Sequence, residues 1–126
     1  MCLTKEQKTI AVLQQIRNAI IQVQEWNAKK NSSNDFLLSP EGMKDLAASS
    51  MLIEAIGEGF KNIDKITEGK LLPLRPEIPW KEVKGMRDKI AHGYFDIDAD
   101  IVFECAKYDL PELIPAIDFF IETIGH

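Results

Sequence analysis

Arg87, Asp88, His92 and Tyr94 place groups suited to phosphate-ester chemistry within eight positions of this 126-residue chain. A guanidinium can stabilise charge on phosphoryl oxygens, and an imidazole can transfer a proton near neutral pH. Asp88 lies four residues before His92, so on a helix the carboxylate would share its face, orient the imidazole and raise its pKa. The segment therefore predicts proton transfer on a phosphodiester, for which no metal ion is required.

The spacing of Arg87 and His92 sets a geometric condition on that chemistry. Residues five positions apart lie about 140° apart around an ideal helix. The two side chains converge on one ligand only if the helix end distorts or if a second copy of the chain contributes. A cleft in a homodimer satisfies the second condition.

The same residues also have ordinary structural interpretations. A histidine at the C-terminal end of a helix often interacts with the helix dipole. Arg87 could pair with an acid, and Tyr94 could pack its ring while exposing its hydroxyl. Spacing alone leaves both interpretations open.

Two long helices are predicted in the first half of the chain. No Pro or Gly interrupts residues 5–29, where apolar residues recur at three- and four-residue steps. This apolar stripe comprises Leu13, Ile16, Ile20, Val23 and Trp26. Short polar residues at 31–35 predict a loop. Ser39 is a good N-cap and Pro40 suits the first helical position, so the second helix should run from there to about Thr67.

Gly57 and Gly59 fall inside the second helix, where each costs up to about 1 kcal/mol relative to alanine. We expect another helix to approach closely at these glycines, with the approach of a ligand as the alternative. Glu54 and Glu58 lie four positions apart on one face, where like charges repel unless a cation such as Lys61 answers them. These carboxylates are either solvated or line a cleft.

Proline and glycine delimit a third helix that carries the motif. Glycine and three prolines within residues 69–79 exclude a helix there and predict an extended connector. The third helix should open at Pro79 and end near His92, because Gly93 suits the left-handed position after a helix. Its predicted inward residues are Trp80, Val83, Met86 and Ile90.

The last part of the chain predicts two further helices. Asp98 can cap a short fourth helix that contains Cys105, and Asp109 can cap a fifth. Pro115 removes one internal hydrogen bond, so the fifth helix should begin late or bend. No stretch alternates as a strand does, and we expect one all-α domain over residues 1–126, folded as a helical bundle.

Charge is distributed unevenly. The net charge of −5 opposes non-specific binding of nucleic acid. Residues 61–89 hold eight Lys/Arg and five Asp/Glu, a local +3, whereas residues 96–126 hold one and eight, a local −7. An anionic substrate could approach the middle of the chain, while the acidic end is solvated or faces a basic partner.

Two cysteines without CxxC spacing predict reduced structural thiols and no standard zinc site. The chain has no apolar run long enough to span a membrane, and its N-terminus lacks the order of a secretory signal. We therefore expect a cytoplasmic protein.

The motif and its surroundings resemble a known family. Arg87-x-x-x-x-His92-x-Tyr94 resembles the R-x-x-x-x-H-x-Y motif of HepT toxins in the HEPN superfamily. The lead-in PWKEVKGM at 79–86 is similar to the family's P-W-x-x-[IV]-x-G-M, and YFDID at 94–98 is similar to its Y-F-x-[IV]-D. With IEAIGEG at 53–59, the likeness covers most of residues 45–125.

The resemblance implies a HEPN up-and-down bundle of four to five helices that forms a homodimer. Arg87 and His92 of both subunits would be catalytic in a shared cleft, where RNA is cut without metal or cofactor by attack of its 2′-hydroxyl. The implied partner is an MntA-like minimal nucleotidyltransferase antitoxin, which silences the toxin by AMPylation of Tyr94. Added charge and bulk there would repel RNA.

The chain departs from the family at Asp88, where many members carry Asn. An acid here either repels RNA phosphate or fixes His92, so it bears on catalytic strength. The alternative function is a non-catalytic nucleotide-binding or accessory module for a nucleotidyltransferase. A purely structural bundle is a third possibility.

Overall fold

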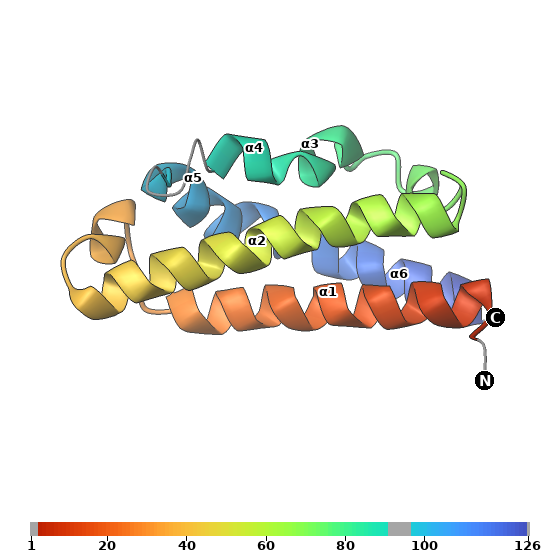
Figure 1. Cartoon of the computed structure of the whole chain (residues 1–126), viewed down its shortest axis with the longest axis horizontal. Coiled ribbons are helices and arrows are strands. Elements are labelled where there is room, and N and C mark those ends of the chain that lie inside the picture. Colours follow the sequence, from red (N-terminus) through yellow and green to blue (C-terminus); the bar gives the residue numbers. More distant parts are fainter. Residues whose placement is uncertain (1–2, 91–96, 126) are drawn as a thin grey trace.

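The computed structural model describes residues 3–90 and 97–125, and within these ranges the regular elements are helices, with no β-strand. They form an up-and-down bundle in which α1 and α2 run side by side in opposite directions (Figure 1). The third run of the bundle lies along α2 and consists of two short helices. The fourth run goes back in the opposite direction and consists of the last two helices. The α-helices are α1 (Lys5–Asn27), α2 (Pro40–Ile66), α3 (Trp80–Lys84), α4 (Met86–Ile90), α5 (Ala99–Glu104) and α6 (Leu113–Gly125).

The helix starts follow from local side-chain chemistry. The Thr4 hydroxyl accepts from the Gln7 backbone N–H at 3.1 Å, and the Gln7 side chain accepts from the Thr4 N–H at 2.9 Å. The predicted caps at Ser39 and Asp98 are confirmed, because they accept from the N–H groups of Gly42 and Ile101. Each cap satisfies a donor that has no partner within its helix.

The core lies where the four runs of the bundle meet, and large apolar side chains fill it. The Trp80 ring, half-buried on α3, lies 5.0 Å from Phe60 of α2 and 5.8 Å from Phe120 of α6, measured between ring centroids. Fully buried residues of the long helices include Leu13, Ile20, Val23, Ile53, Phe60 and Ile63. Burying such a side chain stabilises the fold by about 1.5–3 kcal/mol.

Close helix approach explains Gly57 and Gly59 of α2, as predicted. A Cβ at Gly57 would lie 3.2 Å from the carbonyl oxygen of Val83 and 3.3 Å from that of Lys84. A Cβ at Gly59 would lie 2.8 Å from two side-chain carbons of Ile16. Gly57 therefore lets the end of α3 rest on α2, and Gly59 lets α1 do so.

The sequence predicted Trp26 as the last residue of the apolar stripe on α1, and this prediction is wrong. Trp26 is 37% exposed, whereas Asn27 is buried. The Asn27 amide donates to the Val23 carbonyl and to the Ser49 hydroxyl, both at 2.8 Å. These bonds allow a polar side chain to replace the tryptophan between α1 and α2.

The third predicted helix is broken in two. The break falls at Gly85, whose N–H still bonds to the carbonyls of Lys81 and Glu82, while the Asp88 N–H turns back to the Gly85 carbonyl at 3.1 Å. Glycine has a low helix propensity, and the carbonyls just before it face α2. The predicted helix end near His92 and Gly93 lies outside the described residues.

Two connections differ from the sequence prediction. The connector at 69–79 is not entirely extended, because Leu72–Leu74 form a 3₁₀ turn with Leu72 buried. A π-helical turn, η3 (Cys105–Asp109), follows α5. The last helix begins late, at Leu113, as the proline at 115 predicted, so Asp109 is not its cap.

No described helix is both long and apolar enough to cross a membrane.

Candidate functional site

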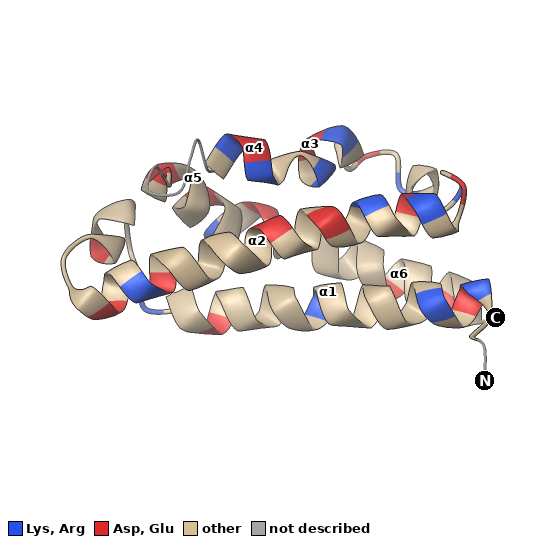
Figure 2. Ribbon diagram, in the orientation of Figure 1, with Lys and Arg blue, Asp and Glu red and all other residues tan. Residues whose placement is uncertain are grey.

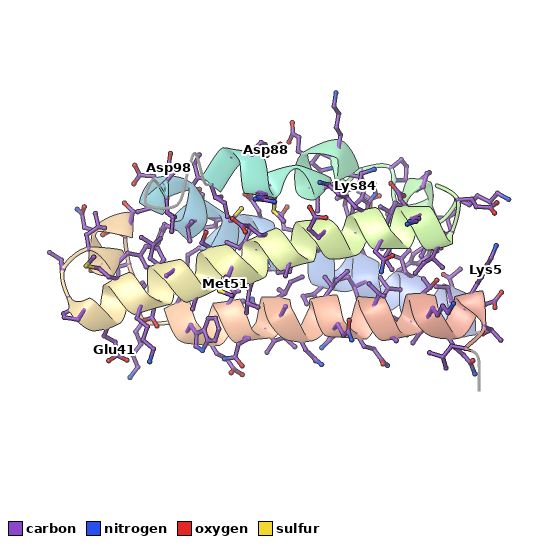
Figure 3. All side chains as sticks on the ribbon, viewed as in Figure 1. Lys5, Glu41, Met51, Lys84, Asp88 and Asp98 are labelled. Carbon is purple, nitrogen blue, oxygen red and sulfur yellow. The ribbon has the colours of Figure 1, made fainter. Side chains whose placement is uncertain are left out.

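Arg87 and Asp88 lie on the solvent side of α4. Met86 and Ile90 anchor this helix, being 5% and 0% exposed, whereas the three charged residues between them are exposed. Figure 3 shows Asp88 at the outer edge of α4. Burial of one apolar edge therefore fixes a short helix that presents the guanidinium to solvent.

His92 and Tyr94 lie outside the described residues, and so does the predicted pairing of Asp88 with His92. The described residues on either side of this segment are joined to each other. The Asp98 N–H donates to the Ile90 carbonyl at 2.9 Å, so the start of α5 is joined to the end of α4.

Glu54 and Glu58 lie on the face of α2 that borders α3 and α4. Glu54 is half-buried and Glu58 is exposed, and the Lys61 amine bonds to Glu58 at 3.1 Å. Both glutamates flank Gly57, which rests against the end of α3. Met51 lies at i, i+3 and i+7 spacing with them and therefore shares their face. Among the described residues, no ion pair joins Arg87 to either glutamate.

Most other cations of α3 and α4 are paired. Lys84, labelled in Figure 3, bonds to Asp64 of α2, and Lys89 lies 3.8 Å from Glu82. Among the described residues, neither Lys81 nor Arg87 forms an ion pair. Figure 2 shows both signs of charge along α3 and α4. Arg87 is therefore an exposed cation of α4 without an ionic partner in the described part of the chain.

Sequence analysis missed a pocket of about 380 Å³ on another side of α4. Met86, Lys89 and Ile90 form one of its walls, and Cys105 contributes to another. Burial and the nearby Asp109 carboxylate raise the pKa of the Cys105 thiol to about 12. Residues from five helical elements and from the connector before α3 meet there, so no local sequence pattern predicts the pocket.

Within residues 3–90 and 97–125, no three carboxylate, imidazole or thiol groups lie close enough together to hold a metal ion.

Known proteins provide independent information on this chain. The family model described as "Ribonuclease HepT-like" matches residues 7–119. "Putative RNase MJ1216" of Methanocaldococcus jannaschii is 37% identical over 98 residues, which cover 78% of this chain and 76% of that protein. "Probable ribonuclease HepT" of Thermococcus cleftensis is 36% identical over 101 residues, covering 80% and 84% respectively. The search of solved structures gave no significant match.

The family match spans nearly all of the described bundle, from α1 to the middle of α6. It includes α4, the segment that follows it and the α2 face beside it. The all-helical architecture agrees with the bundle that the motif resemblance implied. The chain belongs to the HepT-like ribonuclease family.

Proposed function

We propose that this protein is a metal-independent endoribonuclease in which Arg87 and His92 act on the scissile phosphate. The observation that carries the proposal is Arg87 on α4, exposed and without an ion pair to any described residue, in a chain that belongs to the HepT-like ribonuclease family. The names of its relatives, which call them ribonucleases, support the same activity.

The proposed reaction is an internal transesterification. The RNA 2′-hydroxyl attacks phosphorus, the bond to the 5′-oxygen breaks, and the products are a 2′,3′-cyclic phosphate and a 5′-hydroxyl. His92 takes the 2′-hydroxyl proton or supplies the proton to the leaving oxygen, while Arg87 stabilises charge on the non-bridging oxygens. With two copies of the chain, one imidazole accepts a proton and the other donates one.

Exposed apolar side chains on α2 support pairing into a homodimer. Met43 and Met51 are 57% and 72% exposed, and Ala47 between them is exposed too. Their spacing of four residues places them along one side of α2, the side that continues into Glu54 and Glu58. Covering this stripe with its counterpart would bring two α4 helices near one cleft and offer Glu54 and Glu58 cationic partners across it.

We extend the proposal to a cytoplasmic toxin–antitoxin pair. A minimal nucleotidyltransferase would transfer AMP from ATP to the Tyr94 hydroxyl, releasing pyrophosphate. The adenylate would place a negative charge beside the cleft and repel RNA. Support for this step is the motif tyrosine itself.

Cleavage of a labelled RNA in the presence of a metal chelator tests the nuclease. Arg87→Ala should slow cleavage by about 10²–10³-fold and His92→Ala by about 10²–10⁴-fold, because each removes one stabilising or proton-transferring group. Lys81→Ala removes an exposed cation from α3 and should leave cleavage nearly unchanged. If both motif variants cut as fast as the parent chain, the proposal fails.

Intact mass after co-expression with a nucleotidyltransferase tests the modification. The parent chain should gain the mass of one or more AMP groups, and Tyr94→Phe should gain none.

An accessory module that only binds nucleotide would show neither RNA cleavage nor growth inhibition in its unmodified form.

A further inference from the structure

The pocket beside α4 has the character of a small-molecule site. Its volume, about 380 Å³, lies within the usual range for ligand pockets of roughly 300–1,000 Å³. Its apolar lining comprises Val83, Met86 and Ile90 of α3 and α4, together with Ile101 of α5 and Leu113 of α6. Because these residues come from separate elements, the hollow is formed by the tertiary fold.

The charged residues at the pocket are not balanced. Arg75 bonds to Glu77 at 2.7 Å, and Lys89 lies 3.8 Å from Glu82, so the two cations already have acidic partners. Asp109 and Glu112 also line the pocket, and among the described residues neither forms an ion pair. These two carboxylates leave the end of the pocket near η3 and α6 negative.

The remaining polar group at the pocket is not a nucleophile. Cys105 is 5% exposed, its pKa is raised to about 12, and its sulfur lies 3.8 Å from the Met86 sulfur. A protonated thiol beside a thioether behaves as part of an apolar surface. The pocket is therefore suited to holding a ligand and not to reacting with one.

We propose that this pocket binds a small amphipathic cation, an alkylammonium compound with a short apolar chain. The chain lies against the apolar lining that α3, α4, α5 and α6 contribute. The ammonium group lies at Asp109 and Glu112, where it supplies the missing positive charge. Anions such as nucleotides are disfavoured by the same carboxylates.

Neither Arg87 nor Asp88, the two motif residues that the structure describes, lines this pocket, whereas Met86, Lys89 and Ile90 do. Arg87 lies three positions before Ile90, about 60° away around an ideal helix, so α4 presents the motif arginine beside the pocket and not inside it. The inference does not rest on the proposed ribonuclease activity, and its test requires no RNA.

Titration of the full-length protein, monitored by methyl NMR, tests the proposal. The probes are hexylammonium, hexan-1-ol and hexanoate, at constant ionic strength and pH. Hexylammonium should cause saturable shifts at the methyl groups of Ile90, Ile101 and Leu113. It should bind roughly fivefold more tightly than the alcohol, the factor that a partly exposed ion pair provides, and hexanoate should bind most weakly.

Charge-neutralising variants distinguish the effect of these two carboxylates from the effect of the protein's overall negative charge. Asp109→Asn with Glu112→Gln should reduce the affinity for hexylammonium to that of the alcohol and leave binding of the alcohol unchanged. Glu25→Gln with Glu41→Gln removes two exposed acids elsewhere and should change neither affinity. Since Asp109 and Glu112 are both exposed, these changes should leave the fold intact, as the methyl spectrum without ligand would show.

Three results would overturn the proposal. One is equal affinity for all three probes. Another is shifts that do not saturate or that spread over the whole chain. The third is a change of the pocket methyl groups with protein concentration alone, which would mean that a second copy of the chain fills the hollow.

Discussion

Asp88 places a negative charge directly after the arginine of the motif, on the exposed side of α4. Its neighbours Arg87 and Lys89 are both cations, so the acid lowers the local positive charge that RNA would meet. The same carboxylate lies four positions before His92 and can favour the protonated imidazole. The predicted pairing with His92 would therefore give a more basic imidazole at the cost of some attraction for RNA.

Asp88→Asn should lower the pKa of His92. The carboxylate stabilises the imidazolium, and the neutral amide does not, so the imidazole would lose its proton at lower pH. NMR titration of the His92 ring protons measures this directly. Glu104→Gln, an exposed acid on α5, is the control and should leave the titration unchanged. An unaltered His92 titration in Asp88→Asn would rule out the pairing.

Cys105 should resist thiol reagents in the folded protein. The experiment uses the Cys2→Ser variant at about pH 8. A disulfide reagent should modify Cys105 at least about 100-fold more slowly in the folded chain than in the unfolded chain. In the folded chain the thiol is protonated and the reagent cannot reach it. Absorbance of the released thiol follows the reaction. Rapid modification of the folded chain would contradict the buried position.

The raised pKa of Cys105 also predicts how stability changes in alkali. Folding raises this pKa from 9.0 to about 12, so the folded state favours the protonated thiol. The contribution is fully present below pH 9.0 and is lost as the pH rises toward 12. Urea unfolding at increasing pH should show a smaller alkaline loss of stability in Cys105→Ala than in the parent chain.

The contact between α2 and α3 depends on a glycine, and a nearby glycine provides a comparison. At Gly57 an added Cβ would meet the backbone carbonyls of Val83 and Lys84, which can move only with α3. At Gly59 it would meet the end of the Ile16 side chain, which can change its rotamer. The two glycines therefore differ in how rigid their neighbours are.

Gly57→Ala should lower the free energy of unfolding by about 1–3 kcal/mol, even though alanine favours the helix by up to about 1 kcal/mol. Gly59→Ala should have a smaller effect, because the Ile16 side chain can move away from the new methyl group and the helix preference offsets part of the remaining cost. Urea unfolding followed by circular dichroism measures both. Equal destabilisation by the two substitutions would show that the rigidity of the neighbour does not decide the cost.

Pairing of whole chains should depend on the exposed stripe of α2. Met51→Glu would place a charge in the proposed interface, so we expect the dimer to dissociate at micromolar protein concentration and RNA cleavage to be lost with it. Light scattering coupled to size exclusion gives the mass. Leu74→Glu alters an apolar residue that is 50% exposed outside α2 and should leave the dimer intact. A Met51→Glu dimer of unchanged affinity would exclude this interface.

The sequence by itself determined the helical class, the helix starts at Ser39 and Asp98, and the late start of the last helix. Each depends on interactions within a few residues, such as a cap or a proline, so a local pattern contains the information. The family resemblance was equally visible, because its motif lies within one short stretch of chain. The match over residues 7–119 bears it out.

Only the tertiary structure decided the break at Gly85, the exchange of Trp26 for Asn27 in the core, and the pocket beside α4. Each arises where residues far apart in sequence meet. Carbonyls of α3 contact Gly57, the Asn27 amide bonds to Ser49, and six parts of the chain line one hollow. Periodicity records which side of a helix is apolar. It does not record which neighbour covers that side, and packing between elements settles that.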